Sequence, residues 1–165
     1  MIIYFLFLET RNTFIQDEKE TKLVVSAAWT CAYEKGLRVV VDLKYDTIMS
    51  EKEMHSLAKQ IKYCYATIRR MITPFAFHLV NCKDRIESQL QKIDYDKWGI
   101  RAYKEPLKDV FPAQEIVYLS PDATEVLTEL HQTSVYVIGG IVDKSKLSVI
   151  FKILNGRNLN NFELV

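Results

Sequence analysis

The sequence predicts an α/β domain built on an open, mostly parallel sheet with flanking helices. Four short runs rich in β-branched and aromatic residues have the composition of buried strands: residues 37–43, 75–80, 116–119 and 135–138. Segments with helical periodicity lie between most of them, which is typical of this class. A chain of 165 residues with 48% hydrophobic content is long enough for one such domain and a short extension.

The first 36 residues are predicted to form an N-terminal helical extension. Residues 16–35 place apolar side chains at helical spacing, and Gly36 ends this helix. Residues 1–8 are apolar but too short to span a bilayer and have no basic start, so we interpret them as a packed or disordered terminus, with a signal peptide as the alternative. The first strand follows at residues 37–43, and Asp42 closes it as either a turn acid or a ligand-facing carboxylate.

A second helix is predicted to begin at Glu51, because Ser50 and Glu53 form an S-x-x-E capping box. Its apolar stripe consists of Met54, Leu57, Ala58, Ile61, Cys64 and Ile68. Basic side chains lie on the outer face: Lys52, Lys59 and Arg70 on one line, with Lys62 and Arg69 nearby. Such a row is either a solvated cationic face or a surface that neutralises a phosphate backbone.

The middle of the chain is predicted to alternate strands and helices. Within the strand at 75–80, His78 is interpreted as a hydrogen-bonded core histidine. A helix over 84–93, a short strand over 99–103 and a loop or helical turn over 105–111 follow, and Trp98 is interpreted as a packing residue. Ser120 and Pro121 indicate the start of a helix that reaches about Leu130.

The strand at 135–138 ends in a glycine pair, Gly139 and Gly140, with Asp143 just beyond. A glycine pair permits positive φ and a close backbone approach to a ligand. Ligand crevices in open α/β sheets lie outside the carboxyl ends of the strands. The pattern therefore predicts a small-molecule site with Asp143 beside it, and a tight turn with a solvated acid is the alternative.

Several blocks in this order resemble the tRNA (guanine-9 N1)-methyltransferase family of eukaryotes and archaea. They are residues 38–43 (RVVVDL), 49–53 (MSEKE), 60–61 with 64–65 and 69–70, 116–122 (IVYLSPD) and 139–145 (GGIVDKS). The resemblance implies a SPOUT-like knotted fold that transfers a methyl group from S-adenosyl-L-methionine to guanine N1 of tRNA, with no metal.

The resemblance also assigns roles to residues. Asp143 is expected to accept the N1 proton, and Asp42 to help place the guanine. The donor pocket is expected to be lined by Leu119, Ser120, Gly139 and Gly140. Since the net charge is only +1, tRNA binding requires a local patch, for which the resemblance favours Lys52, Lys59, Lys62, Arg69 and Arg70.

The likeness ends at Ser145, so we expect a partial methyltransferase domain over 37–145, a tail over 146–165 outside the family pattern, and no C-terminal knot elements. Whether this chain alone is active is left open, and the alternative is a non-catalytic RNA-binding or interaction module. A generic nucleotide-binding domain is disfavoured because no G-x-G-x-x-G or P-loop pattern occurs.

Three widely spaced cysteines indicate a reduced, intracellular chain. We expect a monomer without membrane association, cytoplasmic or nuclear rather than mitochondrial.

Overall fold

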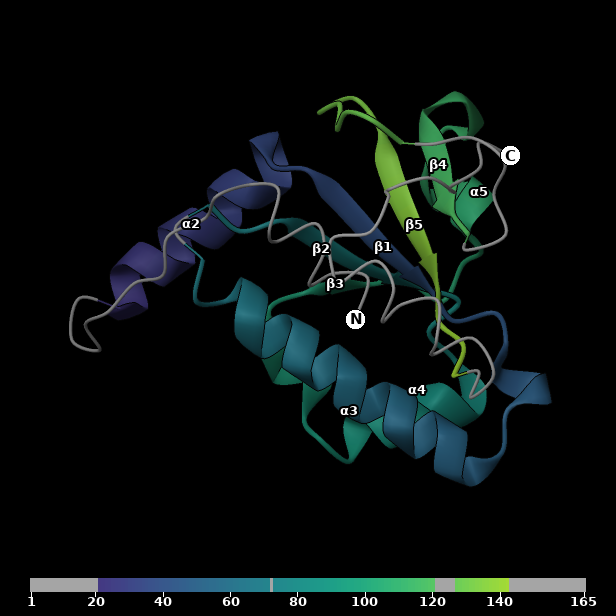
Figure 1. Ribbon diagram of the computed structural model, residues 1–165. Helices are drawn as coiled ribbons and strands as arrows, with labels where there is room; N and C mark the ends of the chain where they lie inside the picture. The colour runs from purple at the N-terminus through teal and green to yellow at the C-terminus, as the bar shows by residue number, and fades with distance from the viewer. Residues whose placement is uncertain (1–20, 72, 121–126, 143–165) are drawn as a thin grey trace.

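The computed structural model describes residues 21–71, 73–120 and 127–142. Its strands form one sheet in the order β3-β2-β1-β5-β4, and every neighbouring pair is parallel. The strands are β1 (Arg38–Asp42), β2 (Ala76–Val80), β3 (Arg101–Ala102), β4 (Ile116–Leu119) and β5 (Val135–Gly139) (Figure 1). The predicted parallel α/β class is confirmed, and each strand lies where the composition placed it.

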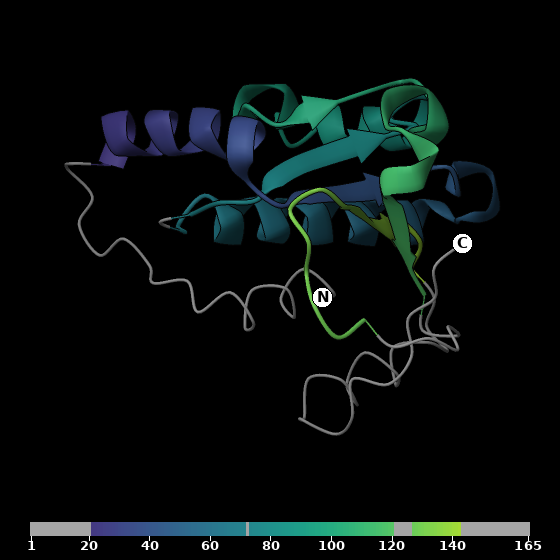
Figure 2. The ribbon, with the colours of Figure 1, turned by 90° about the horizontal axis from the view of Figure 1, so that it is seen from above.

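Helices pack on both sides of this sheet. They are α2 (Thr21–Lys35), α3 (Glu51–Ile68), α4 (Asp84–Gln91) and α5 (Leu107–Val110), with 3₁₀ turns η1 (Asp46–Ile48), η2 (Tyr95–Trp98) and η3 (Ala113–Glu115). Figure 2 shows α2 and α3 on opposite sides of the strands. Among the described residues, no helix combines the length and the apolar character that crossing a membrane requires.

Alternation along the strands divides the apolar side chains into two cores. Odd-numbered residues of β1 and β2 pack with the stripe of α3 and with Ile86 and Leu90 of α4. Val40, Val80, Val135 and Val137 pack on the other face with Phe111. Because successive side chains of a strand point to opposite faces, central strands covered on both sides are apolar over most of their length, as residues 39–41 of β1 and 135–138 of β5 are.

The start of α3 agrees with the prediction. The Ser50 side chain accepts a hydrogen bond from the Glu53 N–H at 3.3 Å, and the Glu53 carboxylate accepts one from the Ser50 N–H at 2.8 Å. These bonds satisfy donors that a helix start leaves without intrahelical partners. The buried side chains of α3 are Met54, Leu57, Ala58, Ile61 and Ile68, which is the predicted stripe except that Cys64 is only partly buried.

The helix predicted over 121–130 is wrong in its second half, since residues 127–130 have no helical structure. Residues 121–126 lie outside the described part of the chain, as do the N-terminal segment 1–20 and the tail 146–165. A good N-cap signal at Ser120 is a local preference, and it does not set the length of the segment that follows.

His78 is buried, as predicted, with 3% of its surface exposed, but its Nδ1 has no hydrogen-bond partner among the described residues. The imidazole instead packs between aromatic rings: Tyr33 at 5.2 Å, Tyr103 at 6.0 Å and Phe111 at 5.2 Å between centroids. Burial, with the nearby Arg101 and Arg38 charges, lowers the pKa of His78 to about 4. The ring is therefore neutral at physiological pH.

Trp98 is a packing residue, as predicted. Its ring stacks on Tyr65 with centroids 4.7 Å and planes 5° apart. The Tyr65 ring also lies 6.0 Å, between centroids, from the ring of Trp29 in α2. These aromatic contacts join α2, α3 and η2.

Candidate functional site at the carboxyl edge of the sheet

The carboxyl ends of β1, β5 and β4 meet at one edge of the sheet. Asp42 is the register partner of Gly139, and Leu119 is the partner of Ile138. The chain continues this pairing past the strand end, because the Gly140 N–H donates to the Asp42 carbonyl at 2.8 Å. Residues more than ninety positions apart in the sequence are thus neighbours at the edge where ligand crevices lie in this fold class.

Asp42 is a buried carboxylate with donors on both oxygens. Only 2% of its surface is exposed. Its Oδ1 accepts hydrogen bonds from Asn81 Nδ2 at 2.7 Å and from the Lys44 backbone N–H at 3.2 Å. Its Oδ2 lies 3.3 Å from the Lys44 ammonium and 3.5 Å from the Tyr118 hydroxyl. A carboxylate is retained in such a place because donors and a cation replace the water it has lost.

The Lys44 ammonium connects this carboxylate to two aromatic rings. It lies 5.2 Å from the ring centroid of Tyr45 and 5.0 Å from that of Tyr118, within the range of a cation–π interaction. The two hydroxyls are 3.2 Å apart. Burial, the Tyr45 hydroxyl and the Asp42 charge raise the pKa of Tyr118 far above its ordinary value. Tyr118 therefore remains a protonated hydroxyl that can donate to Asp42.

This group of side chains was only partly visible in the sequence. Asp42 was predicted as a site residue, whereas Lys44, Tyr45, Asn81 and Tyr118 were missed. The nearness of Lys44 and Tyr45 to Asp42 in the sequence was a usable signal. Nothing local indicates Asn81 or Tyr118, which reach Asp42 from the ends of other strands.

The positive φ predicted for the glycine pair is not observed, and a different constraint requires glycine there. Neither Gly139 nor Gly140 has a positive φ, since Gly99 is the one described glycine that does. A Cβ on Gly140 would lie 2.8 Å from Leu43 Cδ2 and 2.9 Å from the Asp42 carbonyl oxygen. Gly140 is therefore required for the close approach of the β5 end to β1, because a side chain there would collide with backbone. At Gly139 the nearest atom is the Tyr118 hydroxyl, at 3.2 Å.

The remaining predicted donor residues differ in accessibility. The Leu119 side chain is 4% exposed and packs in the core with Ile138, so Leu119 could meet a donor only through its backbone. Ser120 and Gly139 are half-buried at the edge. Gly140, the fourth predicted donor residue, is buried, and a contact of the donor with these four residues stays a prediction. Asp143, the predicted proton acceptor, lies outside the described residues.

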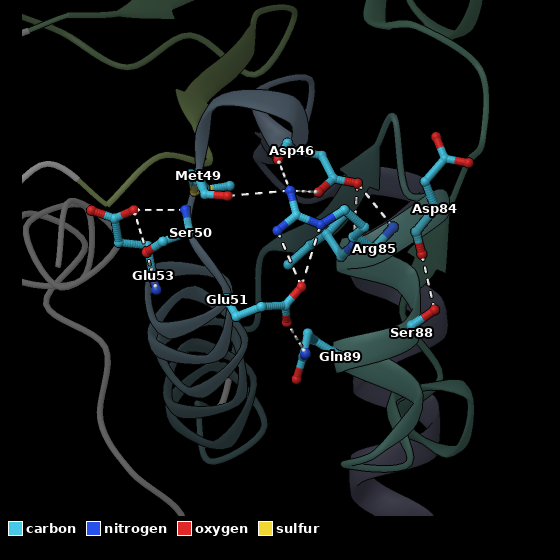
Figure 3. A network of polar contacts seen from close by, with 10 residues as sticks. Asp46, Met49, Ser50, Glu51, Glu53, Asp84, Arg85, Ser88 and Gln89 are labelled. Carbon is cyan, nitrogen blue, oxygen red and sulfur yellow. Dashed lines mark hydrogen bonds and ion pairs between the residues drawn. The ribbon is translucent and has the colours of Figure 1, made fainter.

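The loop that follows Asp42 is fixed to the start of α4. The Asp46 carboxylate accepts from the backbone N–H of Arg85 at 2.9 Å and of Ile86 at 3.4 Å, so it caps α4 from another element. The Arg85 guanidinium donates in return to the carbonyls of Asp46 and Met49 and to the Glu51 carboxylate, at 3.1–3.2 Å (Figure 3). This network was not predicted, and it fixes Asp46 and Met49 of the 43–50 loop, which also carries Lys44 and Tyr45.

The segment from β2 into α4 contacts the end of β1 through Asn81 and the 43–50 loop through Arg85. Asn81 and Asp84 both have positive φ, of 53° and 55°, a conformation that asparagine and aspartate tolerate better than other non-glycine residues. The backbone of this turn thus places the Asn81 amide on Asp42 and the Arg85 N–H on Asp46.

All five basic residues predicted to bind RNA are exposed. Lys52, Lys59 and Lys62 lie on α3, whereas Arg69 is its C-cap and Arg70 follows in the next turn. No ion pair involves the three lysines within the described ranges. The acidic side chains of α3 are occupied elsewhere: Glu51 pairs with Arg85 at 3.1 Å, and Glu53 is in the capping box. The positive charge of this face is therefore not cancelled by its own helix.

The fold and this edge define an all-parallel α/β domain with a buried carboxylate at the carboxyl end of its central strand and an exposed basic helix. The family model for tRNA (guanine(9)-N(1))-methyltransferase TRM10/TRM10A matches residues 9–152. The chain belongs to this family.

Known relatives agree with that assignment. The chain is 37% identical over 113 residues to tRNA methyltransferase 10 homolog A of Xenopus tropicalis, covering 66% of this chain and 33% of that protein. It is 32% identical over 120 residues to the tRNA (guanine(9)-N1)-methyltransferase of Eremothecium gossypii, covering 68% of this chain and 39% of that protein. The chain thus spans between a third and two-fifths of these two relatives.

Solved structures of the same family share the fold. A full-length spTrm10 solved as a complex with SAH superposes with a TM-score of 0.62 at 26% identity, covering 74% of this chain and 73% of that one. A second structure, spTrm10(74), gives a TM-score of 0.63 at 27% identity and covers 72% and 66%. The predicted SPOUT-like architecture is confirmed for the described residues.

Proposed function

We propose that this chain binds tRNA and presents guanine 9 for methylation at N1, with S-adenosyl-L-methionine as the methyl donor. The observation that carries the proposal is the Asp42 group. A buried carboxylate with a half-exposed lysine and two tyrosine hydroxyls lies at the sheet edge, in a chain whose family acts on a purine. The expected partner is tRNA, and a monomer suffices for the site.

Asp42 acts in this proposal as a positioning residue. At 2% exposure its carboxylate is too enclosed to contact a base directly, but it fixes the Lys44 ammonium, whose side chain is 50% exposed. The ammonium can donate to the O6 of guanine, an acceptor that adenine replaces with an amino group. Lys44 therefore favours guanine over adenine in the crevice.

The reaction also requires that the nucleotide leave its stack, which costs a few kcal/mol. When bound, S-adenosyl-L-methionine would supply an electrophilic methyl group on its sulfonium. Among the described residues, we expect Ser120 and Gly139 to contact it. The N1 proton must go to an acceptor, for which the family resemblance assigns Asp143, and such general-base help is typically worth about 10²–10⁴ in rate.

The test is methyl transfer from labelled S-adenosyl-L-methionine to tRNA transcripts that carry guanine or adenine at position 9. We expect 1-methylguanosine in the first transcript and a much smaller amount of methylated product in the second. Lys44→Met is expected to lower transfer at least tenfold, while Lys108→Met leaves it unchanged, because Lys108 is exposed on α5, which packs on the sheet face opposite to α3. Equal transfer to both transcripts, or equal activity of both variants, would contradict the proposed role of Lys44.

A second candidate function is RNA binding without methyl transfer. The exposed basic face of α3 favours it, because all five basic residues predicted to bind RNA are described and exposed. Tight tRNA binding combined with no labelled product would favour this candidate. Failure to bind tRNA would overturn both.

A further inference from the structure

Tyr63 is an exposed aromatic residue on the basic face of α3. Its side chain is 71% exposed, the highest value among the large hydrophobic residues that the structure describes. No hydrogen bond or ring contact involves Tyr63 within the described ranges. Trp98 differs, because its ring is already stacked on Tyr65 at 4.7 Å. As far as the described residues show, Tyr63 therefore has a ring face available to a partner.

The position of Tyr63 places it among the cations. At about 100° per residue, it lies about 40° around the helix from Lys59, one turn earlier, and about 20° from Lys52. Lys62 precedes Tyr63 and lies to one side of this row, near Asp94. The Asp94 carboxylate is itself paired with Lys97 at 2.7 Å. The ring thus stands beside ammonium groups that no carboxylate of α3 neutralises.

An exposed tyrosine by itself indicates nothing, since isolated apolar residues are common on protein surfaces. Its combination with a row of lysines is more informative. Proteins that bind unpaired nucleic acid place basic side chains along the phosphate backbone and aromatic rings where the bases stack. A protein partner is less well matched, because a row of basic side chains is best neutralised by regularly spaced negative charges such as the phosphates of a nucleic acid.

We propose that Tyr63 stacks on an unpaired base of the bound tRNA while Lys52 and Lys59 contact the flanking phosphates. This inference rests on the proposed function, since it specifies how the same basic face contacts its RNA. The interaction is a non-covalent π-stack that depends on the ring and not on the hydroxyl.

The experiment measures tRNA binding by fluorescence anisotropy at several salt concentrations. Tyr63→Ala is expected to lower affinity about 5- to 100-fold, the usual range for losing one base–aromatic stack, with the slope of log K against log salt unchanged. Tyr63→Phe should retain wild-type affinity. Lys59→Gln should reduce the slope by about one, because one phosphate contact is lost.

A perfect RNA duplex of equal length serves as the comparison ligand, and Gln114→Ala as the control, since Gln114 is exposed in η3, just before the amino end of β4. Tyr63→Ala should weaken duplex binding much less than tRNA binding, and Gln114→Ala should change neither. If Tyr63→Ala binds tRNA like the wild type while Lys59→Gln reduces the slope, only the stacking inference fails. If the wild type does not bind tRNA at all, the proposed function fails with it.

Discussion

The buried His78 predicts a specific loss of stability at acidic pH. Its pKa is about 4 in the folded chain and about 6.5 in an unfolded one. Between these values the unfolded state binds more protons, so stability falls as pH drops from 6.5 toward 4. Using 1.36 kcal/mol per pKa unit, the contribution lost is about 2 kcal/mol at pH 5 and about 3 kcal/mol below pH 4.

The assay is urea unfolding followed by circular dichroism between pH 7.5 and pH 4.5. Carboxylates also titrate in this range, so the informative quantity is the difference between variants. His78→Phe keeps the aromatic environment and removes the titrating group. Between pH 7.5 and pH 5, we therefore expect the decrease in its free energy of unfolding to be about 2 kcal/mol smaller than the decrease in the wild type.

The chain offers a matched control, because it contains three histidines and the other two are exposed. His55→Gln, on the outer face of α3, should follow the wild-type pH dependence. If His78→Phe also follows it, the imidazole is not held neutral by burial and the reasoning is wrong. A lower stability of His78→Phe at every pH does not affect this comparison, because the slope is measured and not the absolute value.

Two further predictions concern the structures that position Asp42. Gly140→Ala should lower the free energy of unfolding by about 1–3 kcal/mol, since its Cβ would lie 2.9 Å from a backbone carbonyl oxygen. Gly139→Ala should cost less, because its nearest neighbour is the movable Tyr118 hydroxyl at 3.2 Å. Arg85→Gln should speed amide hydrogen exchange of the 43–50 loop while costing only about 1 kcal/mol, because the guanidinium is partly exposed. Arg69→Gln, an exposed arginine outside this network, serves as its control.

Each of these has a clear contrary result. Equal unfolding free energies for the two glycine variants would show that the β5 end can move away from β1 without cost. Unchanged exchange of the 43–50 loop in the Arg85 variant would show that the carbonyl contacts of the guanidinium do not hold the loop. Either result would remove the argument that the edge is rigid around Asp42.

The sequence was sufficient for those features that depend on nearby residues. Strand positions followed from β-branched composition, because central parallel strands are covered on both faces. The start of α3 followed from Ser50 and Glu53, since a capping box is formed within one helical turn. The exposed basic face followed from helical periodicity. Asp42 was placed at the carboxyl edge because it ends a strand.

Tertiary structure alone decided what surrounds Asp42. Asn81 and Tyr118 are 39 and 76 positions away, and they meet it only because the sheet brings four strand ends together in the order β2-β1-β5-β4. The same holds for Asp46 and Arg85, and for the collision that requires glycine at position 140. Local sequence sets which conformation each segment prefers. The contacts between segments depend on strand order and register, which are fixed by how the whole core packs.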